Sequence, residues 1–143
     1  MSSLEWTKFA WASNYDAGAH LAFRIATSLI FIIGGLGHFG QSQVMMARIE
    51  QSPWYDLVLS LGDPLFFLYL SGAVMVPAGI ALAVGYRARF ASLMLFMTLV
   101  PITFVIHIAP DHVGPLFKNI AILGALAHFF TAGGGARSLT PDY

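Results

Sequence analysis

The sequence predicts an all-α integral membrane protein, a four-helix bundle with both termini on the same side. Residues 64–86 contain no Asp, Glu, Lys, Arg or His. Three further stretches lack Asp, Glu, Lys and Arg; they are residues 25–47, 90–110 and 119–136. A bilayer core of ~30 Å needs ~20 mostly apolar helical residues. Four such stretches fill most of this 143-residue chain.

Composition supports this class and excludes several others. Hydrophobic residues make up 57% and charged residues 10%, whereas soluble domains carry roughly 25% charged residues. A soluble helical bundle is therefore the less favoured alternative. The length predicts a single domain over residues 1–143. The net charge of zero gives no electrostatic footprint for nucleic acid. The chain has no cysteine, so any redox chemistry needs a bound cofactor or a partner.

The first residues are expected to lie at the membrane surface. Residues 1–19 mix polar and aromatic side chains and lack the basic start, short apolar run and cleavage site of a secretory signal. Aromatic rings favour the headgroup level; those in this segment are Trp6, Phe9, Trp11 and Tyr15. We expect an interfacial segment here, and expect the first span to act as its own insertion signal.

Four spans are predicted, over residues 19–39, 64–84, 88–109 and 115–132. Asp63 is a candidate N-cap, and Pro64 suits the first helical position. Gly85 ends the second span ahead of a tight basic turn at residues 86–89, Pro110 closes the third span, and residues 133–135, all glycine, close the fourth.

Small residues and prolines within the second and third spans suggest packing devices. Gly72, Gly79 and the row Ala73, Pro77 and Ala81 provide small surfaces for close approach of another helix. Pro77 and Pro101 lie within predicted helices, where proline can kink the backbone.

The distribution of basic residues predicts the orientation. The side of the membrane that holds the termini carries Lys8, Arg87, Arg89 and Arg137, with Arg24 just inside the first span, while the opposite side has Arg48 and, just inside the fourth span, Lys118. Lys and Arg near span ends favour the cytoplasm. We therefore expect cytoplasmic termini and an outward-facing loop at residues 40–62, which in a Gram-negative source faces the periplasm.

The loop at residues 40–62 is too apolar for a free tether. Its apolar residues include Val44, Met45, Ile49, Trp54, Tyr55, Leu57, Val58, Leu59 and Leu61. We expect two short interfacial helices flanking Pro53 that pack on the outer mouth of the bundle. A passive membrane-surface pad and a lid over a pocket remain alternatives.

One stripe of the first span combines polar and small residues. At 3.6 residues per turn, one face carries Arg24, Ser28, Phe31, Gly35 and His38. A charge near the bilayer centre costs roughly 2.5–3.5 kcal/mol on insertion scales, so this stripe should face the bundle interior. For Arg24 the alternative is snorkelling to the cytoplasmic headgroups.

Polar side chains from three spans are expected to converge below the loop. His38 ends the first span, Thr103 and His107 share a face near the end of the third, and Lys118 and Asn119 begin the fourth. Asn119 and the helix N-terminus add donors beside Lys118, so we favour an inward Lys118 side chain. His128 is expected near the other membrane face, and Asp111 and His112 in the outer connection.

This cluster can be explained by two kinds of ligand or by simple hydration of the helix ends. A quinone or similar amphiphile fits best, because its carbonyl groups accept hydrogen bonds while its ring packs on aromatic side chains; available for this are Trp54, Tyr55, Phe104 and Phe117. A haem between His38 and His107 is less favoured, and the residues can also be merely hydrated helix ends. The predicted spans contain no Asp or Glu, which disfavours a proton pump built on carboxylates. No metal-binding spacing is present.

Four segments resemble the DoxX family of small four-span bacterial membrane proteins. They are Arg24 with residues 30–38 (IFIIGGLGH), residues 79–87 (GIALAVGYR), the pair Thr103 and His107, and residues 118–125 (KNIAILGA), followed by a short tail at Ser138 and Leu139. The resemblance extends over roughly residues 19–140. Its most specific part is the Lys118-Asn119 segment.

The resemblance implies a membrane subunit of a quinone-linked system in a bacterial plasma (inner) membrane. Relatives include a subunit of a thiosulfate:quinone oxidoreductase and proteins that resemble membrane anchors for oxidative-stress or thiol-handling partners. The residues that match the family's motifs, and that the resemblance therefore implies as functional, are Arg24, Lys118 and Asn119. Many members have a Glu in the second span, where this chain has Ala-Val-Met-Val-Pro at residues 73–77; chemistry that needs this carboxylate is not implied.

The leading interpretation is a DoxX-like subunit that binds quinone near the outer leaflet and is not catalytic without a protein partner. The alternatives are a non-catalytic scaffold in a larger complex and a small transporter. Besides membrane lipid, we expect a protein partner and no nucleic acid. Lys118→Met is expected to weaken quinone retention.

Overall fold

The computed structural model describes residues 3–108 and 113–140, with side chains from residue 16 onward. Within that part of the chain the regular structure is helical: α1 (Ser3–Gly40), α2 (Ser42–Glu50), α3 (Tyr55–Leu61), α4 (Pro64–Val84), α5 (Ala88–Ile102), the π-helix η1 (Thr103–His107) and α6 (Val113–Ala132). Four helical segments are long and apolar enough to cross a membrane: Asp16–Gly40, Pro64–Val84, Ala88–His107 and Val113–Ala132. The predicted fold class is confirmed, while Pro110, Asp111 and His112 lie outside the described residues.

The caps of α4 form as the sequence predicts. Asp63 accepts a hydrogen bond from the backbone N–H of Leu65 at 2.9 Å, and Pro64 occupies the first turn. At the other end Gly85 adopts a left-handed conformation with φ 71°, which glycine allows without a steric penalty. These two signals place α4 at the predicted bounds.

The third span changes its helical geometry near its end. Pro101 lies in the last turn of α5, and the chain continues as the π-helix η1 through His107. Proline removes a backbone donor from the helical ladder, and π-helical turns are rare in α-helices and frequent at functional sites. Thr103 and His107, the first and last residues of η1, are both candidate site residues.

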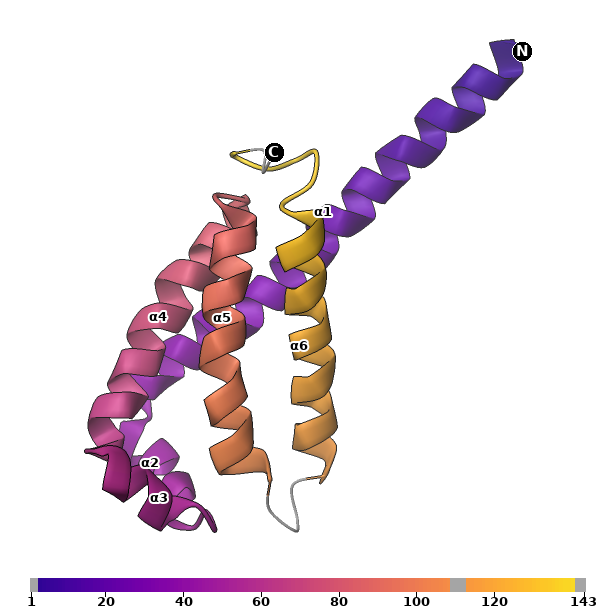
Figure 1. The fold of residues 1–143 in the computed structure, drawn as a ribbon. Coiled ribbons are helices and arrows are strands. Elements are labelled where there is room, and N and C mark those ends of the chain that lie inside the picture. Colours follow the sequence, from indigo (N-terminus) through magenta and orange to yellow (C-terminus); the bar gives the residue numbers. More distant parts are fainter. Residues whose placement is uncertain (1–2, 109–112, 141–143) are drawn as a thin grey trace.

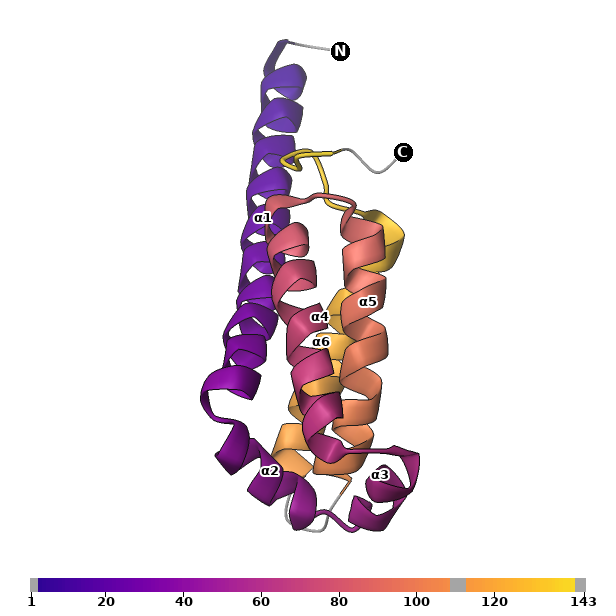
Figure 2. The same cartoon turned by 90° about the vertical axis from the view of Figure 1, so that its left-hand side faces the viewer.

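The first helix is longer than the sequence predicts. It runs unbroken over 38 residues, about 57 Å at 1.5 Å per residue. Its N-terminal third projects away from the other helices (Figures 1 and 2). The expected surface segment at residues 1–19 is thus continuous with the first span, apart from residues 1–2, which are not described.

The spanning helices form a layer with one oblique partner. In Figure 1, α4, α5 and α6 lie side by side, and α1 crosses behind them. Helix α1 packs mainly on α4 and makes fewer contacts with α6. The end of the bundle that carries α2 and α3 is called the loop end here, and the end with the α4–α5 turn and residues 133–140 the terminal end.

Glycines bring α1 and α4 close together. A Cβ on Gly72 of α4 would lie 2.9 Å from the carbonyl oxygen of Gly35 in α1, and a Cβ on Gly35 would lie 2.9 Å from Cβ of Met75. A Cβ on Gly79 would lie 2.9 Å from Cγ1 of Ile32. The prediction that Gly72 and Gly79 allow close helix approach is confirmed.

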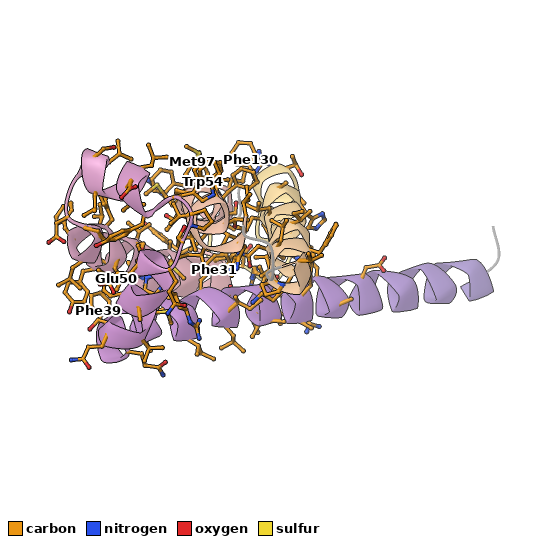
Figure 3. All side chains as sticks on the ribbon, turned by 90° about the horizontal axis from the view of Figure 1, so that it is seen from below. Phe31, Phe39, Glu50, Trp54, Met97 and Phe130 are labelled. Atoms are coloured by element: carbon orange, nitrogen blue, oxygen red, sulfur yellow. The ribbon has the colours of Figure 1, made fainter. Side chains whose placement is uncertain are left out.

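The core is apolar, and so is the outer surface. Phe31, Leu82, Leu95, Leu126 and Phe129 are almost completely buried between the helices. Figure 3 shows Phe31 among the helices, with Met97 and Phe130 toward the outside. Large apolar side chains are exposed around the bundle, among them Ile33, Phe66, Phe90, Met97 and Phe117. An apolar exterior of this kind is typical of lipid contact.

Candidate functional site

The inward stripe of α1 is confirmed. Arg24 is 1% exposed, Ser28 and Phe31 are fully buried, and Gly35 and His38 are buried as well. One helical face therefore carries polar groups from the terminal end to the loop end of the bundle. These polar groups meet different partners at the two ends.

At the loop end, His38 binds α4. Its Nδ1 lies 2.8 Å from Oγ of Ser71 and 3.2 Å from the carbonyl oxygen of Leu68. The Ser71 hydroxyl donates to the same carbonyl at 2.7 Å. A carbonyl only accepts, so this geometry suits an Nδ1–H donor on His38. His38 thus fixes the last turn of α1 to α4.

The second polar pair at this end joins η1 to α6. Asn119 Nδ2 donates to Oγ1 of Thr103 at 3.0 Å, and Thr103 Oγ1 donates to the carbonyl oxygen of Leu99 at 2.7 Å. Both side chains are buried, Asn119 to 4% exposure and Thr103 to 7%. Removal of one partner would leave the other buried polar group without a hydrogen bond, which lowers the free energy of unfolding. Two of the predicted site residues are therefore brought together.

Contrary to the expectation from the sequence, the Lys118 side chain does not point into the bundle. Its side chain is exposed on the surface of α6. Successive residues of a helix point about 100° apart, and Asn119 occupies the inward direction, so Lys118 is directed away from the bundle interior. An exposed lysine near a helix end can extend its ammonium group to lipid headgroups. The expected inward arrangement of Lys118 is wrong.

The loop helices cover the loop end. Helix α2 contacts α4 and η1, and Figure 2 shows α2 and α3 across the base of the spanning helices. Ser52 donates to the carbonyl oxygen of Val105, and Nε1 of Trp54 donates to that of Ile108 at 3.2 Å. The Trp54 and Phe104 rings lie 4.5 Å apart. The prediction of two short helices that flank Pro53 and pack on the bundle is confirmed.

These contacts attach the loop between α2 and α3 to the π-helix η1 and the residue after it. Val105 and Phe104 belong to η1, as do Thr103 and His107. The aromatic contact and the Ser52 hydrogen bond therefore act on the same five-residue segment that carries the buried Thr103. Of the predicted ligand residues, Thr103, His107 and Asn119 lie on adjoining segments, since η1 contacts α6, while His38 is tied to α4.

Arg24 lies at the opposite end and contacts a segment that the sequence analysis treated as a tail. Its Nη1 donates to the carbonyl oxygen of Gly134, and its Nη2 donates to that of Arg137 at 2.7 Å. Its Nε is buried without a hydrogen-bond partner among the described residues. Residues 133–140 are called the C-terminal strap here. Arg24 therefore holds this strap rather than reaching the headgroups.

The strap also pairs with the turn between α4 and α5. The backbone N–H groups of Leu139 and Thr140 donate to Val84 and Gly85 at 3.0 Å and 3.2 Å. The C-termini of α4 and α6 both lie here, and helix C-termini carry partial negative charge. The carbonyl oxygens at these two helix ends thus stabilise the buried guanidinium of Arg24.

Aromatic and imidazole rings close the terminal end between α1 and α6. The Phe23 and Phe129 rings lie 5.0 Å apart, and those of His20 and His128 lie 5.6 Å apart. His128 was expected near this membrane face. His20 and the strap carried no sequence signal, because the contacts of His20 with α6 and of the strap with α4 and the turn after it join residues more than 50 positions apart.

Comparison with known proteins gives one family. A family model described as DoxX matches residues 19–108. The matched range contains Arg24, His38, Thr103 and His107, and ends before Lys118 and Asn119. Neither the curated proteins nor the solved structures give a match.

Proposed function

We propose that this chain, which belongs to the DoxX family, is a membrane subunit of a quinone-linked redox system. In this proposal it binds quinone or a similar amphiphile at the loop end. The observation that carries the proposal is the buried Thr103–Asn119 hydrogen bond at an irregular helix covered by Trp54. The setting would be a bacterial plasma membrane, with this site toward the outer leaflet.

The chemistry of the loop end supports an amphiphile with a carbonyl headgroup. Asn119 supplies an amide, and Thr103 a hydroxyl, in otherwise apolar surroundings. Ligand sites of this kind combine a mostly apolar lining with a few placed polar groups. The Trp54 and Phe104 rings supply an aromatic surface beside η1, on which a quinone ring can stack. His107, half-buried at the end of η1, is the third polar group assigned to this site.

Electron transfer requires a partner in this proposal. Reduction of a quinone to a quinol takes up two electrons and two protons, and the chain has no cysteine to supply electrons. A protein partner with its own redox centre would donate the electrons, while this chain holds the quinone. His38 and Lys118 are kept as peripheral candidates, and a haem between His38 and His107 is the less favoured cofactor.

The test is quinone retention by the purified protein. Thr103→Val and Asn119→Leu should each lower the quinone extracted per protein by about three- to tenfold, as expected for the loss of one hydrogen bond. Thr98→Val is the matched control, because the Thr98 hydroxyl makes the same kind of hydrogen bond within α5, to the carbonyl oxygen of Met94 at 2.8 Å. Normal folding with unchanged quinone content in both variants would contradict the proposal.

A scaffold role is the second candidate, and the N-terminal third of α1 favours it. This segment projects beyond the bundle (Figure 1) and offers a helical arm to another protein. Removal of residues 3–15 should abolish co-purification of a partner if the chain is a scaffold. A quinone-binding subunit should keep its quinone after the same truncation, because the loop end lies at the other end of α1.

A further inference from the structure

An apolar groove lies on the outside of the bundle, between α4 and α5. It has a volume of about 410 Å³, within the size range of ligand pockets; its helical lining includes Ala73, Pro77 and Ala81 of α4 and Phe90 and Met94 of α5. The sequence predicts a helix-packing role for the row Ala73, Pro77 and Ala81. In the structure α1 instead packs at Gly72 and Gly79, and the alanine row faces this groove.

The groove has one charged end. Its lining ends at Tyr86 and Arg87 in the α4–α5 turn, and both residues are exposed. The helical lining is otherwise apolar. Tyr at a span end favours the headgroup level, and an arginine there is placed to bind phosphate oxygens.

The length of the groove corresponds to one leaflet. From Ala73 to the end of α4 at Val84, the helix rises about 16 Å at 1.5 Å per residue. Half of a ~30 Å hydrocarbon core is about 15 Å. The apolar part thus reaches from mid-membrane to the headgroup level, where Arg87 lies.

We propose that the groove between α4 and α5 binds one anionic phospholipid, with an acyl chain along Ala73, Pro77 and Ala81 and the phosphate on Arg87. The occupant is a lipid of the leaflet at the terminal end. Charge complementarity selects an anionic headgroup, because a basic residue near the membrane surface favours anionic lipid. This site is separate from the proposed quinone site at the loop end.

The conformation of Arg87 provides a useful variant. Its φ is 44°, a left-handed conformation in which Asn is favoured over most side chains. The backbone N–H of Arg87 donates to Oγ1 of Thr140 at 2.9 Å, so the strap holds the turn independently of the guanidinium. Arg87→Asn therefore removes the charge without adding backbone strain, and Arg87→Gln keeps part of the side-chain length.

Native mass spectrometry of the full chain with added lipid tests the proposal. The wild type should bind phosphatidylglycerol about fivefold more tightly than phosphatidylcholine, which corresponds to about 1 kcal/mol. Arg87→Gln and Arg87→Asn should abolish this preference, whereas Arg48→Gln, at an exposed position of α2, should retain it. Ala73→Trp should weaken binding of both lipids by filling the groove.

Three outcomes would overturn the proposal. The first is equal binding of the two lipids by the wild type, and the second is an unchanged preference in both Arg87 variants. The third is a disulfide-linked dimer formed in high yield by Ala73→Cys in this cysteine-free chain, which would make a second copy the occupant. Displacement of the lipid by inorganic phosphate at equal concentration would instead assign Arg87 to free phosphate and would also refute the lipid site.

Discussion

At the scale of single residues, the two ends of the α1 stripe use their polar groups differently. His38 anchors a helix end through Ser71 and Leu68, whereas Arg24 gathers carbonyl oxygens from the strap. A guanidinium serves this purpose better than an ammonium, because its planar fork donates to two acceptors at fixed angles. Arg24, the arginine by which the first span resembles the family, therefore has a structural role at the terminal end.

Replacing Arg24 should release the strap. Arg24→Met removes both donors and is expected to lower the free energy of unfolding by at least about 1.5–3 kcal/mol, the range for one hydrogen bond that involves a charged group. Hydrogen exchange of residues 133–140, measured in lipid nanodiscs, should become much faster. Arg24→Lys should give an intermediate rate, because it keeps the charge and loses the fork.

Arg48→Met is the control for this experiment, since Arg48 is exposed on α2 and distant from the strap. An unchanged exchange rate in Arg24→Met would show that the backbone pairing of Leu139 and Thr140 is sufficient to hold the strap. Arg24 would then need another role.

At the scale of helices, the packing of α1 on α4 depends on the absence of side chains. Gly72→Ala places a Cβ 2.9 Å from the backbone oxygen of Gly35 and from a ring carbon of Phe39. Backbone atoms cannot yield as a flexible side chain does, so we expect destabilisation by about 1–3 kcal/mol, as for other overpacked sites. Thermal unfolding in detergent measures this.

Gly124→Ala is the matched control for Gly72→Ala. A Cβ on Gly124 of α6 meets nothing within 4 Å. Alanine favours the helix over glycine by up to about 1 kcal/mol, so this variant should be neutral or stabilised. Equal effects of the two substitutions would refute the close contact between α1 and α4.

The backbone amide hydrogens of residues 42–62, which include α2 and α3, are expected to exchange slowly with solvent because this segment is anchored at η1. Trp54→Ala removes both the ring contact with Phe104 and the hydrogen bond to Ile108. Hydrogen exchange across residues 42–62 should then rise at least severalfold. Leu61→Ala, at a side chain that is 70% exposed, should leave the rate unchanged; equal acceleration by both substitutions would contradict anchoring through Trp54.

At the scale of the whole molecule, sequence reasoning succeeded wherever the signal was local. Uncharged stretches and caps such as Asp63 and Gly85 predicted the spans, and the 3.6-residue period predicted the buried stripe that contains Arg24. The loop helices followed from apolar residues around Pro53. Each of these signals lies within a single helix or turn.

Features that depend on long-range contacts could not be predicted from the sequence. The partners of Arg24 at Gly134 and Arg137 lie 110 and 113 positions further along the chain, and the oblique course of α1 depends on its packing against α4. The convergence of Thr103 and Asn119 was predicted, whereas the direct hydrogen bond between them depends on how α6 packs against η1. The side of α6 on which Lys118 lies depends on which neighbour packs inward, and Asn119 takes that position. The extension of α1 to Ser3 was missed because the segment is too polar to be identified as part of a span.

The final prediction concerns the orientation of the whole bundle. The strap and the α4–α5 turn lie at the same end (Figure 1), and that end carries Arg87, Arg89 and Arg137. Excess Lys and Arg near span ends favours the cytoplasm. A reporter fused after Tyr143 should therefore be active only if it is a reporter that works in the cytoplasm. A periplasm-dependent reporter inserted at exposed Pro53, between α2 and α3, should be active in the same chain, and the reverse pattern would place the loop end inside the cell and the proposed quinone site in the inner leaflet.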